Sequence, residues 1–102
     1  MFIVKITYLV ELNEIDKYIQ AHRDFLDTYY QSGEFLASGP MRPRTGGIVV
    51  SLGNDKSKIE AIFQNDPYYK AEVASYEFIE FSAVKHSAVL TPMLREANHA
   101  NL

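Results

Sequence analysis

The sequence contains no cysteine, and this absence excludes several kinds of chemistry. Without thiols the protein has no disulfide, no thiolate metal site and no nucleophilic or redox-active cysteine. It also has no run of lysines or arginines, and 13 acidic against 10 basic side chains give a formal net charge of -3. Nucleic acids and anionic membranes are bound through concentrated positive charge, so we expect neither as a partner. These features suit the cytoplasm.

The sequence also lacks a long hydrophobic run. Its opening segment, residues 1–10, is apolar but contains Lys5 and is far shorter than the ~20 residues of a membrane-spanning helix. No basic leader precedes it, so we interpret it as a strand and not as a targeting signal. With 102 residues, 47% of them hydrophobic, the chain suffices for one small core and not for a second domain.

Patterns of apolar residues predict the main elements. Apolar residues spaced three and four apart predict a helix that Asn13 caps and Gly33 ends, and a shorter helix at residues 59–63. Asp66 and Pro67 then begin a short helical turn over residues 68–73. β-Branched and aromatic residues predict strands over 2–9, 34–38, 47–52 and 75–84.

The order β-α-β-β-α-β predicts an α+β fold of the ferredoxin-like kind, a four-stranded antiparallel sheet with both helices on one face. The strands are apolar on both sides, because Ile3 and Ile79 alternate with other apolar residues, so the face away from the helices needs a cover. A homodimer packed sheet to sheet is the expected cover. Residues 86–102 form a tail after a domain of residues 1–85, with a short helix at 91–96.

His22 and Asp66 are the candidate catalytic residues. His22 lies on the apolar stripe of the first helix, where it is either a core histidine bonded to a carbonyl or a general acid or base. Asp66 is either an ordinary N-cap or a carboxylate that fixes the tautomer of the imidazole. The two are 44 positions apart, and contact is feasible because both helices cover one sheet face.

The candidate substrate-binding residues follow a strand. Ser38 offers a hydroxyl, and Gly39-Pro40 lets backbone approach a ligand closely, although the same segment fits a plain turn. Arg42, like Arg44, could bind an anionic group or be merely solvated. Tyr68 either walls a small apolar pocket or packs in the core.

We expect no metal and no cofactor. His86 and His99 show no ligand spacing with each other or with a carboxylate. The segment Thr45-Gly46-Gly47 is too short for a phosphate loop and opens a strand instead of a helix.

Several of these motifs together resemble the YciI-like (YCII-related) family over about residues 1–85. They are His22, the segment Gly33-Glu34-Phe35-Leu36-Ala37-Ser38-Gly39-Pro40-Met41, the strand at Gly47 and Asn65-Asp66-Pro67-Tyr68. The resemblance implies a dimeric α+β barrel with a pocket between helices and sheet. It also implies that His22 and Asp66 match a proposed acid/base pair, and that some relatives act in dehalogenation or isomerisation of ring-derived compounds.

The leading hypothesis is a cofactor-independent lyase or isomerase acting on a small oxygenated, cyclic or unsaturated compound. His22 would move the proton, and Asp66 would orient the imidazole of His22. A positioned acid or base of this kind accelerates a reaction by roughly 10²- to 10⁴-fold. Ser38 and the Gly39-Pro40 backbone would contact a substrate oxygen, and Arg42 would attract an anionic group. The alternative is a non-catalytic ligand-sensing or dimerisation module with a structural His–Asp pair. A haem or oxygen-handling monooxygenase is weaker, because no iron ligand is evident beyond His22.

Overall fold

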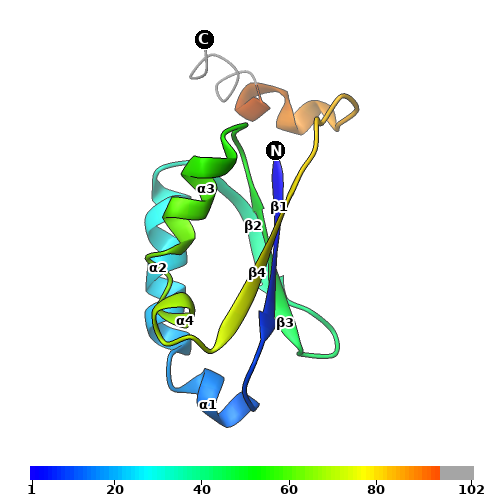
Figure 1. The fold of residues 1–102 in the computed structure, drawn as a ribbon. Helices are drawn as coiled ribbons and strands as arrows, with labels where there is room; N and C mark the ends of the chain where they lie inside the picture. The colour runs from blue at the N-terminus through cyan, green and yellow to red at the C-terminus, as the bar shows by residue number, and fades with distance from the viewer. Residues whose placement is uncertain (95–102) are drawn as a thin grey trace.

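The computed structural model describes residues 1–94, and the chain forms one antiparallel sheet with helices on one face (Figure 1). The strands are paired in the order β2-β3-β1-β4, which is the ferredoxin-like arrangement that the sequence predicts. The elements are β1 (Phe2–Tyr8), α1 (Leu12–Asp16), α2 (Ile19–Gln31), β2 (Phe35–Pro40), β3 (Gly46–Ser51), α3 (Lys56–Phe63), α4 (Pro67–Lys70), β4 (Ala74–Glu80) and a 3-10 turn, η1 (Ala88–Leu90).

The core lies between the sheet and α2, α3 and α4. Along β1, Phe2, Val4 and Ile6 are buried and alternate with more exposed residues, so one face of the strand points at the helices. Phe63 of α3 lies at the centre of this core. Its ring is within 6 Å of four other rings, those of Phe25, Phe35, Tyr76 and Phe78. Such aromatic packing holds both helices against the sheet.

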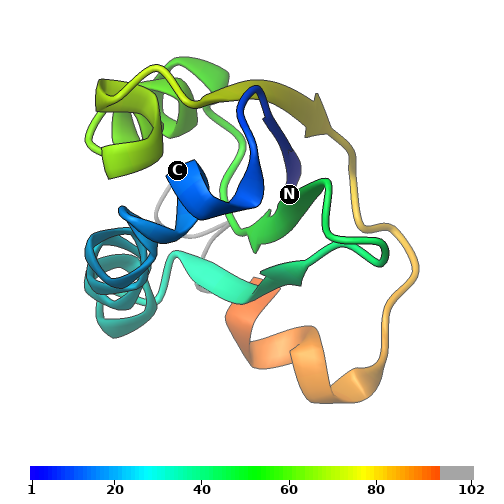
Figure 2. The same ribbon diagram turned by 90° about the horizontal axis from the view of Figure 1, so that it is seen from below.

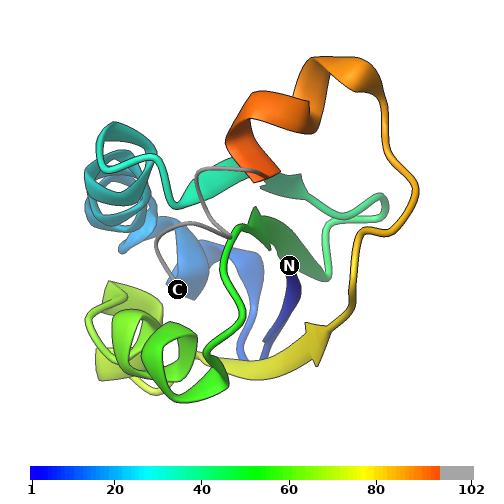
Figure 3. The same ribbon diagram turned by 90° about the horizontal axis from the view of Figure 1, so that it is seen from above.

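The other face of the sheet carries apolar side chains that the helices do not cover. Ile79 of β4 is 44% exposed and pairs with Ile3 of β1. Phe81, just after β4, is 41% exposed. Figures 2 and 3 show the helices on one side of the sheet and the segment after β4 running out on the other side. The prediction that the strands are apolar on both faces is therefore confirmed.

The first predicted helix is in fact two helices, and its predicted N-cap is wrong. Glu11 precedes α1 without a side-chain cap, and Asn13 lies inside that helix. The chain turns at Lys17 and Tyr18 before α2 begins. This break allows Ile15 to be wholly buried while the neighbouring Asp16 reaches an arginine of the β2–β3 loop. Tertiary contacts therefore override a continuous helical pattern.

Two strand ends also differ from the predictions. Gly39 and Pro40 belong to β2, where they pair with Ile48 and Gly47. Because β2 is an edge strand, the missing N–H of a proline is tolerated there. At the other edge, β4 ends at Glu80 and not at Val84, since β1 offers no partner beyond its first residues.

The tail is described only in part. Residues 91–94 are helical, in agreement with the start of the expected short helix, and the rest of that helix lies outside the described residues. None of the helices over residues 1–94 combines the length and the hydropathy needed to cross a membrane.

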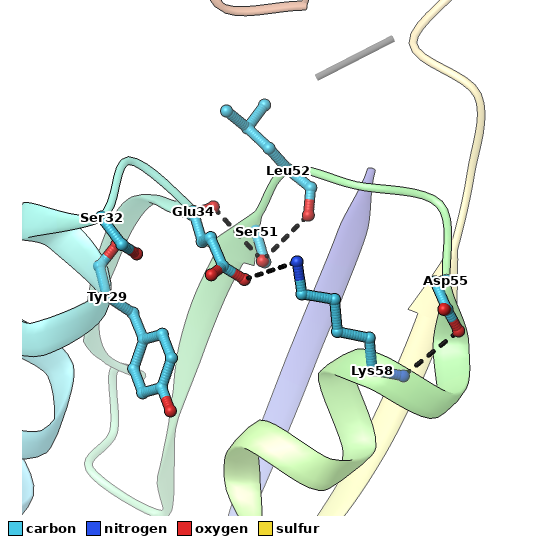
Figure 4. Close-up of polar contacts among 7 residues, drawn as sticks. All are labelled: Tyr29, Ser32, Glu34, Ser51, Leu52, Asp55 and Lys58. Carbon is cyan, nitrogen blue, oxygen red and sulfur yellow. Dashed lines mark hydrogen bonds and ion pairs between the residues drawn. The ribbon is translucent and has the colours of Figure 1, made fainter. Parts of the chain in front are cut away.

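A polar cluster joins β2, β3 and α3 at the end of the sheet near the N-terminus (Figure 4). The hydroxyl of the fully buried Ser51 donates to the backbone carbonyls of Glu34 and Leu52, at 3.3 and 3.1 Å. The Asp55 side chain caps α3 by accepting from the backbone N–H of Lys58. These contacts fix the entry of the chain into α3.

Candidate functional site

Asp66 is positioned by the start of α4. Its Oδ1 accepts a hydrogen bond from the backbone N–H of Tyr68 at 3.0 Å, and Pro67 occupies the first helical position. The carboxylate is fully buried. The prediction that Asp66 is an N-cap is confirmed, and this role explains how the sequence Asp-Pro holds a carboxylate inside the core.

His22 reaches the same carboxylate from α2. Its Nδ1 lies 2.8 Å from Oδ1 of Asp66, and 12% of the histidine side chain is exposed. The contact that the sequence left open is therefore present. The two interpretations of Asp66 are not alternatives, because one oxygen serves both as helix cap and as partner of the imidazole.

Two tyrosines complete the surroundings of this pair. The ring of Tyr68 stacks on the imidazole with centroids 4.1 Å apart and an interplanar angle of 13°. Tyr76 of β4 donates its hydroxyl to Oδ2 of Asp66 at 2.7 Å. Burial raises the pKa of both phenols, that of Tyr68 to about 12, and the negative charge of Asp66 raises both further. Both hydroxyls therefore stay protonated near neutral pH.

The second imidazole nitrogen of His22 reaches the protein surface. Within residues 1–94, Nε2 has no hydrogen-bond partner, whereas every buried side-chain nitrogen or oxygen there has one. Nε2 is consequently not completely enclosed, although only 12% of the whole side chain is exposed. This arrangement, with one nitrogen bonded to a buried carboxylate and the other open, is suited to proton transfer.

The chemistry available to this arrangement follows from the carboxylate. Asp66 is an acceptor for Nδ1–H, so the neutral imidazole is held with its proton on Nδ1 and its lone pair on Nε2. That lone pair can take a proton from a bound compound, and Asp66 then stabilises the cation that forms. The same bond can also serve packing alone, because a buried polar ring needs a partner.

The predicted substrate-binding residues of β2 do not bond to this pair within residues 1–94. The hydroxyl of Ser38 lies 2.5 Å from that of Tyr30, on the last turns of α2. Gly39 and Pro40 are exposed, and a Cβ at Gly39 would meet no atom within 4 Å. These residues leave a polar, unobstructed edge, and their contact with a substrate stays a prediction.

Two arginines of the β2–β3 loop behave differently. Arg42 is exposed and forms no ion pair within the described part of the chain, whereas Arg44 binds Asp16 at 2.6 Å. The Arg44 guanidinium also lies 5.8 Å from the centre of the Tyr8 ring. Tyr8 in turn packs edge-on against Tyr68, at 6.0 Å between ring centroids. Arg44 is thus the arginine that is connected to the His22–Asp66 pair, and the contact of Arg42 with an anionic group stays a prediction.

Tyr68 is almost completely buried, at 2% exposed, so it supports the flat face of the imidazole. The packing interpretation of Tyr68 holds, and a contact with substrate stays a prediction. Sequence reasoning missed Tyr76 and Tyr8. Tyr76 had one usable signal, a tyrosine on the helix-facing side of a strand, whose hydroxyl needs a partner when it is buried.

A cleft at the opposite end of the sheet is lined by Met1, Gly53, Phe81, His86 and Leu94, among others. It contains no residue of the His22–Asp66 pair or of its tyrosines. The N-terminal ammonium group there donates to the carbonyls of Gly53 and Phe81. No two titratable side chains in this cleft are joined by a hydrogen bond or ion pair over residues 1–94, so we regard the His22–Asp66 pair as the candidate site. Across the same residues, no three His, Asp or Glu side chains are grouped to hold a metal ion.

Comparisons with known proteins agree with this fold. Among solved structures, the chain is similar to 5-chloro-2-hydroxyhydroquinone dehydrochlorinase (TftG) from Burkholderia phenoliruptrix AC1100, solved in complex with 2,5-dihydroxybenzoquinone. The TM-score is 0.67 at 16% identity, covering 85% of this chain and 96% of that chain. A search of curated proteins found no match. The sequence model of the YCII-related domain matches residues 1–82, and the chain therefore belongs to the YCII-related domain family.

Proposed function

We propose that the protein is a cofactor-independent lyase or isomerase in which His22 and Asp66 act as an acid/base pair on a small oxygenated ring compound. The observation that carries this proposal is the bond between Nδ1 of His22 and the buried Asp66, combined with an Nε2 that has no hydrogen-bond partner within residues 1–94. A buried carboxylate on one nitrogen makes the other nitrogen a directed proton acceptor. The likeness to TftG, a dehydrochlorinase, supports the choice of a lyase.

In the proposed reaction Nε2 of His22 removes a proton from a carbon or hydroxyl of the substrate. The electron pair left behind forms a double bond, and either a leaving group departs or a proton is returned at another atom. The exposed Arg42, on the β2–β3 loop, attracts an anionic substrate oxygen. Ser38 and the backbone at Gly39 and Pro40 offer further polar contacts. A positioned base of this kind raises the reaction rate by roughly 10²- to 10⁴-fold, which is enough for elimination or isomerisation of an activated ring.

The test is a screen of hydroxylated and chlorinated hydroquinones that includes 5-chloro-2-hydroxyhydroquinone, the compound named for TftG. Turnover is followed by chloride release and by absorbance. His22→Gln and Asp66→Asn are the variants. His86→Gln is the matched control, because within residues 1–94 its ring has one hydrogen-bond partner, the carbonyl of Ser87. The proposal predicts loss of turnover in the first two variants alone. Native-like turnover in His22→Gln contradicts it.

The alternative, a ligand-sensing or dimerisation module, is favoured by the small exposure of the pair, 12% for His22 and none for Asp66. A purely structural pair predicts that the variants lose stability while any binding of small ring compounds is retained. Measuring thermal unfolding together with binding of 2,5-dihydroxybenzoquinone, the ligand in the TftG complex, separates the two. Binding that disappears in His22→Gln without loss of the fold supports the site.

We also propose that a second copy of the chain covers the open face of the sheet. Ile3, Ile48, Val50 and Ile79 form an apolar centre there, since they share one face by the strand register. Sedimentation of the native protein should show a dimer that Ile79→Lys dissociates, whereas Ser57→Lys on the far side should not. A native protein that sediments as a monomer at all concentrations contradicts this.

A further inference from the structure

Both oxygens of the Asp66 carboxylate accept hydrogen bonds. The three donors come from three parts of the chain. Oδ1 accepts from Nδ1 of His22 on α2 and from the backbone N–H of Tyr68 on α4. Oδ2 accepts from the hydroxyl of Tyr76 on β4. Because the carboxylate is wholly buried, no water competes for these positions at its surface. The orientation of the carboxylate therefore depends on these three donors.

Of the three donors, Tyr76 is the one that bonds to Oδ2. His22 and the N-cap bond both act on Oδ1, so without Tyr76 the buried Oδ2 would have no partner among residues 1–94. The Tyr76 ring is fixed by packing against Phe63, with centroids 5.6 Å apart, and this contact does not require the hydroxyl. Burial and the adjacent Asp66 charge raise the pKa of Tyr76, so its hydroxyl remains a donor at all ordinary pH values.

We infer that Tyr76 is a positioning residue, whose hydroxyl holds Oδ2 of Asp66 so that Oδ1 stays directed at Nδ1 of His22. This inference deepens the proposed function and rests on it, because it concerns how the proton-accepting Nε2 of His22 is prepared. Without the hydroxyl, the carboxylate can rotate about its Cβ–Cγ bond to seek another donor. The imidazole then loses its fixed acceptor, and its proton is free to move from Nδ1 to Nε2, which removes the lone pair from Nε2.

The experiment measures the tautomer of His22 in Tyr76→Phe. Phenylalanine keeps the ring and its packing and removes only the oxygen. The two ring-nitrogen chemical shifts of His22 report the fraction of neutral imidazole protonated at Nδ1. The native protein should be held as the Nδ1–H form with a slowly exchanging proton. In Tyr76→Phe, exchange of that proton with water should be faster by roughly tenfold to a hundredfold, the range that corresponds to a hydrogen bond to a charged group, and the Nδ1–H fraction should fall.

Tyr69→Phe is the matched control. Its ring centroid lies 6.0 Å from that of Tyr76, and within residues 1–94 its hydroxyl makes no hydrogen bond. It should leave both the tautomer and the exchange rate at native values. A Tyr76→Phe protein with the native tautomer and exchange rate overturns the inference, as does an equal change in Tyr69→Phe.

The measurement does not depend on turnover, so it separates this inference from the proposed function. A changed tautomer in Tyr76→Phe together with full turnover in His22→Gln would reject the enzyme and retain the positioning role. If turnover is found, Tyr76→Phe should lower kcat with little change in KM, because it alters the base and not the binding surface.

A second measurement needs no variant and covers the case in which Tyr76→Phe fails to fold. In the native protein, the ring-carbon signal next to the Tyr76 hydroxyl should remain that of a neutral phenol at about pH 10, where a phenol in a model peptide ionises. Titration of Tyr76 at about pH 10 would show that its hydroxyl is not bound to Asp66 and would overturn the inference.

Discussion

Among residues 1–94, two polar side chains are wholly buried, Ser51 and Asp66. They lie near opposite ends of the sheet, and their surroundings differ. In the described part of the chain, the Ser51 hydroxyl donates to two backbone carbonyls and to no side chain (Figure 4). Asp66 instead accepts from two ionisable side chains, His22 and Tyr76, and one of these extends to the surface. Ser51 and Asp66 are thus both buried polar groups. They differ in their partners, because those of Asp66 can move a proton and backbone carbonyls cannot.

The comparison also shows why burial is a weak signal of function. A buried hydroxyl that is bonded to main-chain oxygens has its need for a hydrogen-bond partner satisfied. A carboxylate bonded to an imidazole does the same, but it also sets where the imidazole carries its proton. The following predictions test that difference between the Asp66 end and the Ser51 end.

The largest expected effect is on turnover. His22→Gln should lower kcat by about 10²- to 10⁴-fold, the contribution of a positioned base. Ser51→Ala should leave kcat within about twofold of native, since over residues 1–94 the Ser51 hydroxyl bonds to backbone carbonyls and not to the His22–Asp66 pair. Steady-state kinetics on the compound identified by the screen measures both. Equal losses in the two variants would mean that turnover reports the integrity of the fold and not a specific base.

The next effect is on stability. Asp66→Ala should lower the free energy of unfolding by about 3–5 kcal/mol, because it leaves His22, Tyr76 and a backbone N–H without their buried acceptor. Ser51→Ala should lower the free energy of unfolding by about 1 kcal/mol, the contribution of an ordinary hydrogen bond. Urea denaturation of both variants gives the comparison. A smaller loss for Asp66→Ala than for Ser51→Ala would reverse the assignment of the two ends.

A third effect concerns alkaline pH. The pKa values of Tyr68 and Tyr76 are raised in the folded protein, so the folded state keeps protons that the unfolded chain releases near pH 10. The contribution of these tyrosines is complete below about pH 10 and decreases as the pH rises, for Tyr68 up to about 12. Tyr76→Phe should therefore lose stability less steeply above pH 10 than the native protein.

The Ser51 end offers no such group, so Ser51→Ala should keep the native slope of unfolding free energy against pH. Denaturation series at pH 8, 10 and 11 measure the three proteins. A native slope in Tyr76→Phe would show that this phenol does not hold its proton more tightly in the folded state.

The smallest effect comes from backbone strain. Glu72, which follows α4 at the Asp66 end, has φ of 59°, whereas the Ser51 end places glycine at its left-handed position, Gly53 with φ of 103°. Glu72→Gly should therefore stabilise the protein by up to about 1 kcal/mol, and Gly53→Ala should destabilise it by at least that amount. Thermal unfolding measures both. A loss of stability in Glu72→Gly would show that its side chain outweighs the strain.

Much of the fold could be predicted from the sequence. The alternation of β1, the Gly33 stop and the Asp66-Pro67 start each depend on local preferences, and the structure has a strand, a helix end and a helix start at these points. The break between α1 and α2 could not be predicted, because the contacts that accompany it are tertiary: the burial of Ile15 and the Arg44–Asp16 pair. Those contacts join residues that the sequence keeps far apart.

The site was predictable only in part, for a related reason. His22 was identifiable as a polar residue on an apolar helical stripe, and Asp66 as an N-cap. Their contact requires α2 and α4 to be side by side, which the sequence permits and does not require. In the sequence, Tyr76 does not differ from other aromatic residues of a strand. The register of β4 against β1 shows that it faces the helices. The partners of a carboxylate are a property of the assembled fold.

The most direct test of the account is a crystal of the native protein soaked with 2,5-dihydroxybenzoquinone and with small phenols and carboxylates. The account predicts ligand density at the surface edge of His22, with a ligand oxygen or acidic carbon within hydrogen-bond distance of Nε2. Density that appears only elsewhere, such as in the cleft near Gly53 and His86, or an imidazole edge that no compound reaches, would contradict it.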